Sequence, residues 1–103
     1  INMITLTSRQ RAALRSMANN YETIFQIGKG GITDEIVRQI DNTLEARELI
    51  KLRVLDTCPH TSREAANIIS EKTGAVPVSV VGSRFVLYRP STRQDKKDRI
   101  ILP

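Results

Sequence analysis

The segment from residue 24 to residue 35 constrains the fold most, because a strand pattern changes to a helix pattern across a short glycine loop. Residues 24–27, Ile-Phe-Gln-Ile, are mostly β-branched or aromatic and predict a buried strand. Thr33 is a good helix N-cap, and Asp34 and Glu35 follow it in the first turn, where the helix dipole favours negative charge. The sequence therefore predicts a strand, a tight loop and a helix in direct succession.

The loop between these two signals is Gly28-Lys29-Gly30-Gly31, a G-x-x-G sequence. Glycine permits positive φ and lets the backbone approach another molecule closely. A strand–loop–helix junction also points free backbone N–H groups outward, which suits a phosphate. The alternative is a tight turn that binds nothing, and the glycine spacing alone does not separate the two. Lys29 at the tip favours contact with a nucleic-acid backbone.

The helices on either side of this junction are marked by capping boxes and apolar stripes. Thr7 with Gln10 and Thr61 with Glu64 predict the starts of a first and a third helix. The expected buried stripe of the first helix consists of Leu14, Met17, Ala18 and Tyr21. The expected core side of the second helix consists of Ile36, Val37, Ile40 and Leu44, with Arg38, Asp41, Asn42 and Glu45 facing water.

The segment from residue 49 to residue 54 alternates between apolar and basic positions and predicts a strand. Because side chains alternate between the faces of a sheet, Lys51 and Arg53 are expected on one face. The opposite face is expected to be covered by the helices and consists of Ile50, Leu52 and Val54.

The last third of the chain predicts a hairpin followed by a basic arm. Valines at positions 76, 78 and 80 alternate along one strand, and Pro77 places that strand at a sheet edge. Gly82-Ser83 suits a two-residue turn into a returning strand at 84–89. Residues 91–103 are expected to form a flexible basic arm, in which 100–102 dock back on the domain.

These elements predict one α/β domain with the order α-β-α-β-α-β-β and a four-stranded mixed sheet covered by helices. The domain occupies residues 1–103, with its core at about 6–90. The 103 residues are enough for one modest core, and no internal boundary or repeat is visible.

Charge points to a polyanionic partner. The chain carries 16 Lys and Arg against 11 Asp and Glu, a net charge of +5 and a pI near 9.9, which favours nucleic acid over a membrane surface. Few aromatic side chains are present, so recognition of backbone and shape, as in structured RNA, is expected over base stacking on the sheet. Beyond the four loop residues Gly28, Lys29, Gly30 and Gly31, the candidate RNA-binding residues are Arg9, Arg11, Arg15, Lys51, Arg53 and Arg84.

Other function classes find little support in the residues. Cys58 and His60 are the single cysteine and single histidine, and a catalytic Cys/His pair there is the weak enzyme alternative. Two such ligands fall short of the four of a structural zinc site, so no metal and no cofactor are expected. One cysteine, no signal peptide and no apolar run of about 20 residues favour a cytoplasmic protein.

Three sequence blocks together resemble the CRM domain (chloroplast RNA splicing and ribosome maturation), with stand-alone bacterial YhbY-like members as the nearest type. The blocks are IGKGGIT at 27–33, EARELIK at 45–51, and Val81-Gly82 with VLYRP at 86–90. The resemblance covers about residues 6–90. It implies a fold similar to the C-terminal domain of translation initiation factor 3, binding to precursors of the large ribosomal subunit, no catalysis, and an RNA-contacting glycine loop. A general RNA chaperone or a small-RNA regulator is the alternative within RNA-binding proteins.

Overall fold

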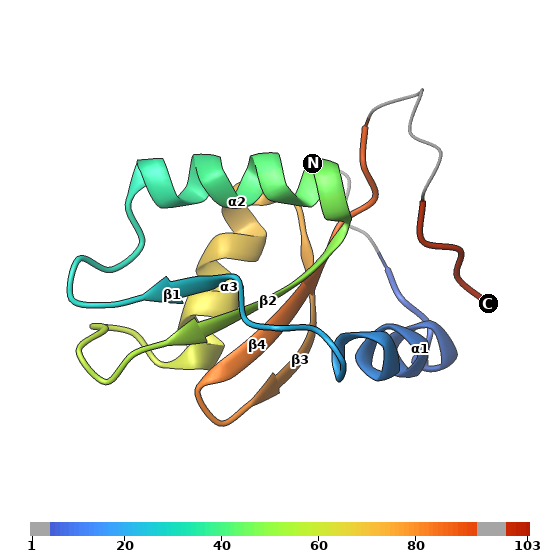
Figure 1. The fold of residues 1–103 in the computed structure, drawn as a ribbon, viewed down its shortest axis with the longest axis horizontal. Coiled ribbons are helices and arrows are strands. Elements are labelled where there is room, and N and C mark those ends of the chain that lie inside the picture. Colours follow the sequence, from blue (N-terminus) through green and yellow to red (C-terminus); the bar gives the residue numbers. More distant parts are fainter. Residues whose placement is uncertain (1–4, 93–98) are drawn as a thin grey trace.

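The computed structural model describes residues 5–92 and 99–103 and confirms the predicted order of three helices and four strands (Figure 1). The elements are α1 (Ser8–Ala18), β1 (Phe25–Ile27), α2 (Asp34–Arg47), β2 (Leu49–Val54), α3 (Ser62–Thr73), β3 (Val76–Val81) and β4 (Arg84–Tyr88). None of the helices in these ranges is long and apolar enough to cross a membrane.

The four strands form one mixed sheet with the spatial order β1-β2-β4-β3. β1 and β2 are parallel, with Ile27 beside Val54, whereas β4 runs antiparallel to both β2 and β3. α2 connects the two parallel strands, as a crossover between parallel strands requires. The hairpin at Gly82 adds β3 at the edge, which agrees with the edge position expected from Pro77.

The helices cover both faces of the sheet, which corrects the expectation that they share the Ile50 face. α2 and α3 do pack there, on Ile50, Leu52 and Val54. α1 packs on the opposite face, where its Leu14 and Ala18 join Leu49, Val78, Val86 and Tyr88 in a second core. The reason is that one end of this second face is apolar too, because Leu49 pairs with Tyr88 across β2 and β4.

The three helix starts lie where the capping signals placed them. Thr7, Thr33 and Thr61 are the N-caps, and the two predicted capping boxes are both formed. The buried stripe of α1 is shorter than predicted. The helix ends at Ala18, so Tyr21 lies beyond it and is 39% exposed, and Met17 is 37% exposed although it lies within the helix.

A bulge in β3 overturns the predicted alternation of its valines. The register passes from Pro77 beside Leu87 to Ser79 beside Val86, which leaves Val78 as the extra residue. Val76 and Val78 therefore pack in the core under α1, while Val80 reaches the core under α2 and α3.

The C-terminal residues Ile100 and Leu102 dock on the domain as expected, whereas Ile101, which was expected to dock with them, is 91% exposed. The side chains of Ile100 and Leu102 pack against the core under α1, and the Pro103 carbonyl accepts a hydrogen bond of 3.3 Å from Gln10 Nε2. The basic residues Arg93, Lys96 and Lys97 of the predicted flexible arm lie outside the described residues.

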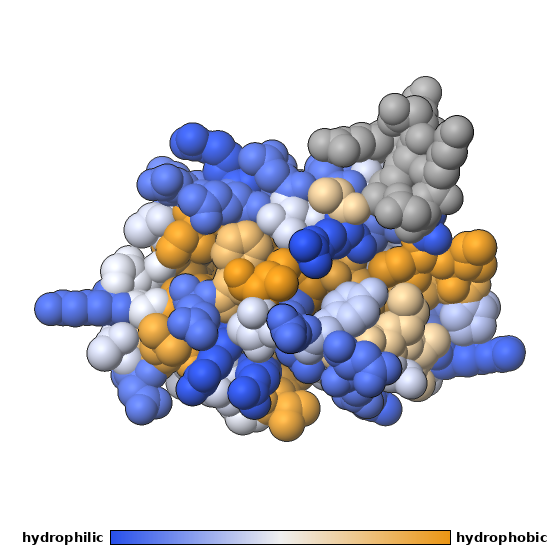
Figure 2. All heavy atoms as spheres, viewed as in Figure 1, coloured by the Kyte–Doolittle hydropathy of each residue, from blue (hydrophilic) through white to orange (hydrophobic). Residues whose placement is uncertain are grey.

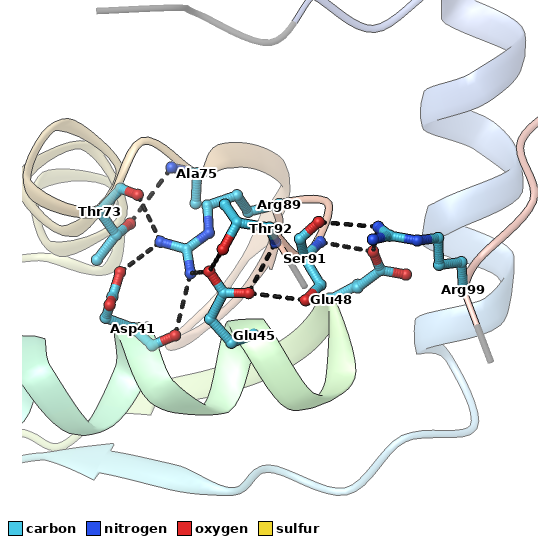
Figure 3. A network of polar contacts seen from close by, with 9 residues as sticks. All are labelled: Asp41, Glu45, Glu48, Thr73, Ala75, Arg89, Ser91, Thr92 and Arg99. Carbon is cyan, nitrogen blue, oxygen red and sulfur yellow. Dashed lines mark hydrogen bonds and ion pairs between the residues drawn. The ribbon is translucent and has the colours of Figure 1, made fainter. Parts of the chain in front are cut away.

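A polar network joins α2 to the end of β4 and to the C-terminal residues (Figure 3). Asp41 and Glu45, which were expected to face water, instead form ion pairs with Arg89. Glu45 also accepts hydrogen bonds from the hydroxyls of Ser91 and Thr92 at 2.7 and 2.6 Å. These hydrogen bonds, that of Thr92 first, lower the pKa of Glu45 from 4.5 to about 2.

Glu48 is the buried centre of the other half of this network. Its carboxylate accepts backbone N–H bonds from Ser91 at 2.6 Å and from Ile100 at 2.8 Å, and Arg99 lies 3.3 Å away. Glu48 also adopts a φ of 65° after the last turn of α2, a conformation that favours glycine. Two of the three sequence blocks thus meet in space, since Glu45 and Glu48 hold the segment that contains Arg89.

Candidate nucleic-acid interface

The glycine loop is a closed turn with one open position. The Gly31 N–H donates to the Gly28 carbonyl at 3.0 Å, and Gly31 is buried with a φ of 68°. A Cβ on Gly31 would lie 3.3 Å from Cγ of Pro59 in the β2–α3 loop. Gly30, in contrast, is exposed, has no positive φ and would place a Cβ in open space. Gly31 is therefore the glycine that the turn requires, and Gly30 is the one a ligand can approach.

The start of α2 directly follows this turn. The Thr33 hydroxyl accepts the Ile36 N–H at 3.2 Å, so one N-terminal donor is already used within the helix. Asp34 and Glu35 are exposed in the first turn and oppose an anion there. Lys29 is exposed and makes no ion pair within the described part of the chain. An anion at this loop would therefore be held mainly by Lys29 and by close approach to Gly30, and less by the dipole of α2.

A row of polar side chains crosses the sheet next to the loop, on the face that α1 partly covers. Gln26, Arg53 and Arg84 are aligned in register on β1, β2 and β4. Neither arginine has an acidic partner among residues 5–92 and 99–103, and Nε of Arg53 is buried without a hydrogen-bond partner. Like charges directly opposite each other destabilise a sheet, and an unpaired buried donor adds to that cost. An anion over this row would relieve both.

The remaining predicted residues are less available or lie elsewhere. Lys51 is half-buried, with its ammonium donating to the Tyr21 carbonyl at 3.3 Å. Arg11 donates to the backbone carbonyls of Pro77 and Val78, so its guanidinium joins α1 to β3. Arg9 and Arg15 are exposed on α1.

The predicted residues therefore fall into two groups at opposite ends of the molecule. The glycine loop and the ends of β1 and β2 lie at the left of Figure 1, whereas α1 lies at the right. Arg53 pairs with Gln26 across β1 and β2, and Gln26 lies only three residues before Lys29. Arg53 therefore belongs with the loop. Arg9, Arg11 and Arg15 belong to the other end, and so does Lys51, whose ammonium bonds the Tyr21 carbonyl just after α1. The loop surface is our name for the first group together with Gln26, which pairs with Arg53, and it consists of Gly28, Lys29, Gly30, Gly31, Gln26, Arg53 and Arg84.

Cys58 and His60 lie in the loop beside this surface, and within residues 5–92 and 99–103 no hydrogen bond joins their side chains. Cys58 is half-buried against the core, and its Sγ accepts the backbone N–H of His60 at 3.4 Å, so this contact does not involve the imidazole. No group of three or more metal-ligating side chains occurs within residues 5–92 and 99–103.

Sequence reasoning missed Gln26 and did not foresee the hydrogen bonds of Arg11 to β3. Gln26 could have been found by pairing the two parallel strands and asking which residues share a face with Arg53. Gln26 pairs with Arg53, and both face away from α2. The bonds of Arg11 to β3 depend on α1 packing on the second face, and no local pattern indicates that choice.

This is a small α/β domain with a glycine loop at a strand–helix junction and a basic row beside it. The CRS1/YhbY (CRM) domain matches residues 6–89, and the chain belongs to this family. The first two blocks of the resemblance, and most of the third, lie within that range.

Relatives of known name agree with this assignment. "Probable RNA-binding protein YqeI" of Bacillus subtilis is 41% identical over 86 residues, which cover 84% of this chain and 90% of the relative. A protein of Haemophilus influenzae named "RNA-binding protein" is 34% identical over 89 residues, covering 86% and 90%. A hypothetical protein of Staphylococcus aureus, solved in solution, is 46% identical with a TM-score of 0.74, covering 96% of this chain and all of the other.

Proposed function

We propose that this protein binds RNA through the loop surface. The observation that carries the proposal is the pair Arg53 and Arg84, two cations directly opposite each other with no acid partner within residues 5–92 and 99–103. Such an arrangement costs stability in the free protein and gains it when phosphates lie over the row. The names of the two bacterial relatives, both RNA-binding proteins, support the same class of ligand.

In this proposal the surface acts by position and charge. Lys29 and Arg84 are exposed and contact phosphates, while the absence of a side chain on Gly30 lets the strand approach the turn. Arg53 turns its half-buried guanidinium, including the unpaired Nε, toward the bound strand. No group in this account performs chemistry, so the proposed function is binding without catalysis.

The resemblance to YhbY-like proteins supports a more specific role. We infer that the RNA is a precursor of large-subunit ribosomal RNA, bound in the cytoplasm during assembly of that subunit. The net charge of +5 supports a polyanion of this kind but does not choose among RNAs.

Crosslinking in living cells tests both levels of the proposal. The protein is irradiated in cells, recovered, and its attached RNA fragments are sequenced. Fragments that include unprocessed large-subunit sequence are expected, and the protein should co-sediment with immature large-subunit particles. Recovery of other RNAs only would remove the ribosomal role, and recovery of no RNA above a mock purification would contradict RNA binding itself.

A further inference from the structure

Exposed hydrophobic side chains concentrate at the end of the molecule away from the loop surface. Within the described residues, five large hydrophobic side chains are exposed, and one of them, Val81, lies on the hairpin beside Arg84. The other four line one groove of about 820 Å³ and are Met17, Tyr21, Ile24 and Ile101. Figure 2 shows hydrophobic side chains gathered over the C-terminal residues beside α1. Concentration of such side chains in one concave site marks a binding surface.

The floor and rim of this groove differ in character. Leu49 and Ile50 of β2 form a buried apolar floor between the end of α1 and the end of α2. Arg47 and Lys51 stand at the rim as cations, and Glu22 is an acid at the same rim. Arg47 is exposed and has no acidic partner in the described ranges, while the further cation Arg99 is paired with Glu48. The groove thus combines an exposed aromatic ring with an excess of positive charge.

We propose that this groove binds an unpaired nucleotide of single-stranded RNA, with the base against the Tyr21 ring and its phosphates near Arg47 and Lys51. This inference rests on the proposed RNA binding and adds a second site to it. Bases stack on exposed aromatic rings whatever their identity, and neighbouring cations hold the backbone. Duplex RNA does not fit this role because its bases are stacked and paired.

Charge also decides between this occupant and a second copy of the chain. A symmetric dimer through the groove would bring the same cation-rich patch of both copies together, because such interfaces pair identical surfaces. Like charges at a buried interface oppose association. A phosphodiester strand carries the opposite charge and avoids this conflict.

Tyrosine fluorescence offers a direct test, because the chain has two tyrosines and no tryptophan. Tyr88 is 4% exposed and serves as an internal reference, whereas Tyr21 is accessible to a base. A short single-stranded pyrimidine oligonucleotide is added to the full chain, with emission corrected for absorption by the RNA. Stacking should quench the Tyr21 emission of the wild-type protein, and the Tyr21→Phe variant should show no quenching.

Affinity for the same oligonucleotide supplies the second readout. Tyr21→Ala should weaken binding about 5- to 150-fold, and Tyr21→Phe should restore most of the loss because it keeps the ring. Arg47→Gln, a change at an exposed residue, should weaken binding and lower the salt slope by roughly 0.7. Thermal melts of each variant show whether the protein remains folded.

Several outcomes separate this inference from the proposed function. Unquenched wild-type emission with unchanged affinity in Tyr21→Ala and Arg47→Gln, while Gly30→Asp still weakens binding, would overturn the groove and leave RNA binding in place. Failure of the wild-type protein to bind any RNA would contradict the proposed function instead. A concentration-dependent dimer that Tyr21→Ala abolishes would assign the groove to a second copy and overturn the inference.

Discussion

The two faces of the sheet differ in how completely they are covered. Among the described residues, the core under α2 and α3 contains twelve buried hydrophobic residues, whereas the core under α1 contains six. The first face carries Ile50, Leu52 and Val54 along the whole of β2 and is apolar throughout. The second face begins with the buried Leu49 and ends with Arg53, so α1 covers only one end of it.

This difference separates the side chains of β2 that stabilise the core from the side chain proposed to bind RNA. The β2 side chains that point one way complete the larger core. Those that point the other way change from the buried Leu49 through Lys51 to Arg53, which has no acidic partner within the described residues. The open end of the second face carries the row of Arg53 and Arg84, and the groove with Tyr21 lies at its opposite end. Arg53 and Arg84 therefore lie on the face with the smaller core, and the groove lies at the edge of that core, with Leu49 in its floor.

The largest expected effect tests this separation at two neighbouring residues. Leu52→Ala should lower the free energy of unfolding by about 2–5 kcal/mol, because it opens a cavity in the core under α2 and α3. Arg53→Gln should change it by less than about 0.5 kcal/mol or raise it, because it removes a like-charge pair. Urea denaturation of both variants checks the contrast. Equal destabilisation would mean that Arg53 has a structural role and would break the comparison.

A smaller, pH-dependent effect is expected at the network that holds the end of β4. The hydrogen bonds from Thr92 and Ser91 are the main cause that lowers the pKa of Glu45 from its ordinary value of 4.5 to about 2. A carboxylate with a depressed folded-state pKa contributes stability above its unfolded pKa and loses it as the pH falls. Glu45→Gln should therefore be less stable than the wild type at neutral pH.

The melting temperatures of the two proteins should converge as the pH falls from about 4.5 to about 2. Thr43→Ser, elsewhere on α2, is the control for the loss of stability that acid causes in any variant of this protein. The Thr43 hydroxyl donates only to the Gln39 carbonyl among the described contacts. A constant difference between wild type and Glu45→Gln across this range would contradict the role assigned to the Glu45 carboxylate.

Local signals allowed most of the elements to be predicted. The threonine caps depend on residues at most three positions apart, and the alternation along β2 is visible in six residues. Long-range choices could not be predicted in the same way. The bulge at Val78 is set by pairing with β4, and the ion pairs of Arg89 join residues more than forty positions apart. The face that α1 occupies follows from pairing between Leu49 and Tyr88, which needs the assembled sheet.

The glycine loop of the candidate site could be predicted from the sequence, whereas the other residues that surround it could be predicted less well. The glycine spacing and Lys29 mark the loop in the sequence alone, and the structure adds that Gly31 needs its positive φ while Gly30 does not. The basic residues of the first helix were grouped with the loop because a sequence does not show where in space each charge lies. The structure places that helix at the other end of the molecule.

The central claim is that RNA lies over the glycine loop and the arginine row. RNA affinity of Gly30→Asp against Gly30→Ala at two salt concentrations tests it most directly, since a Cβ at Gly30 meets no atom within 4 Å and both variants should fold. We predict that Gly30→Asp weakens binding more than Gly30→Ala, because its carboxylate repels phosphate. Lys29→Ala should lower the salt slope by roughly 0.7 for a single strand or 0.9 for a duplex of B-form geometry. Wild-type affinity and slope in well-folded Gly30→Asp and Lys29→Ala would contradict the claim and return this loop to a plain turn.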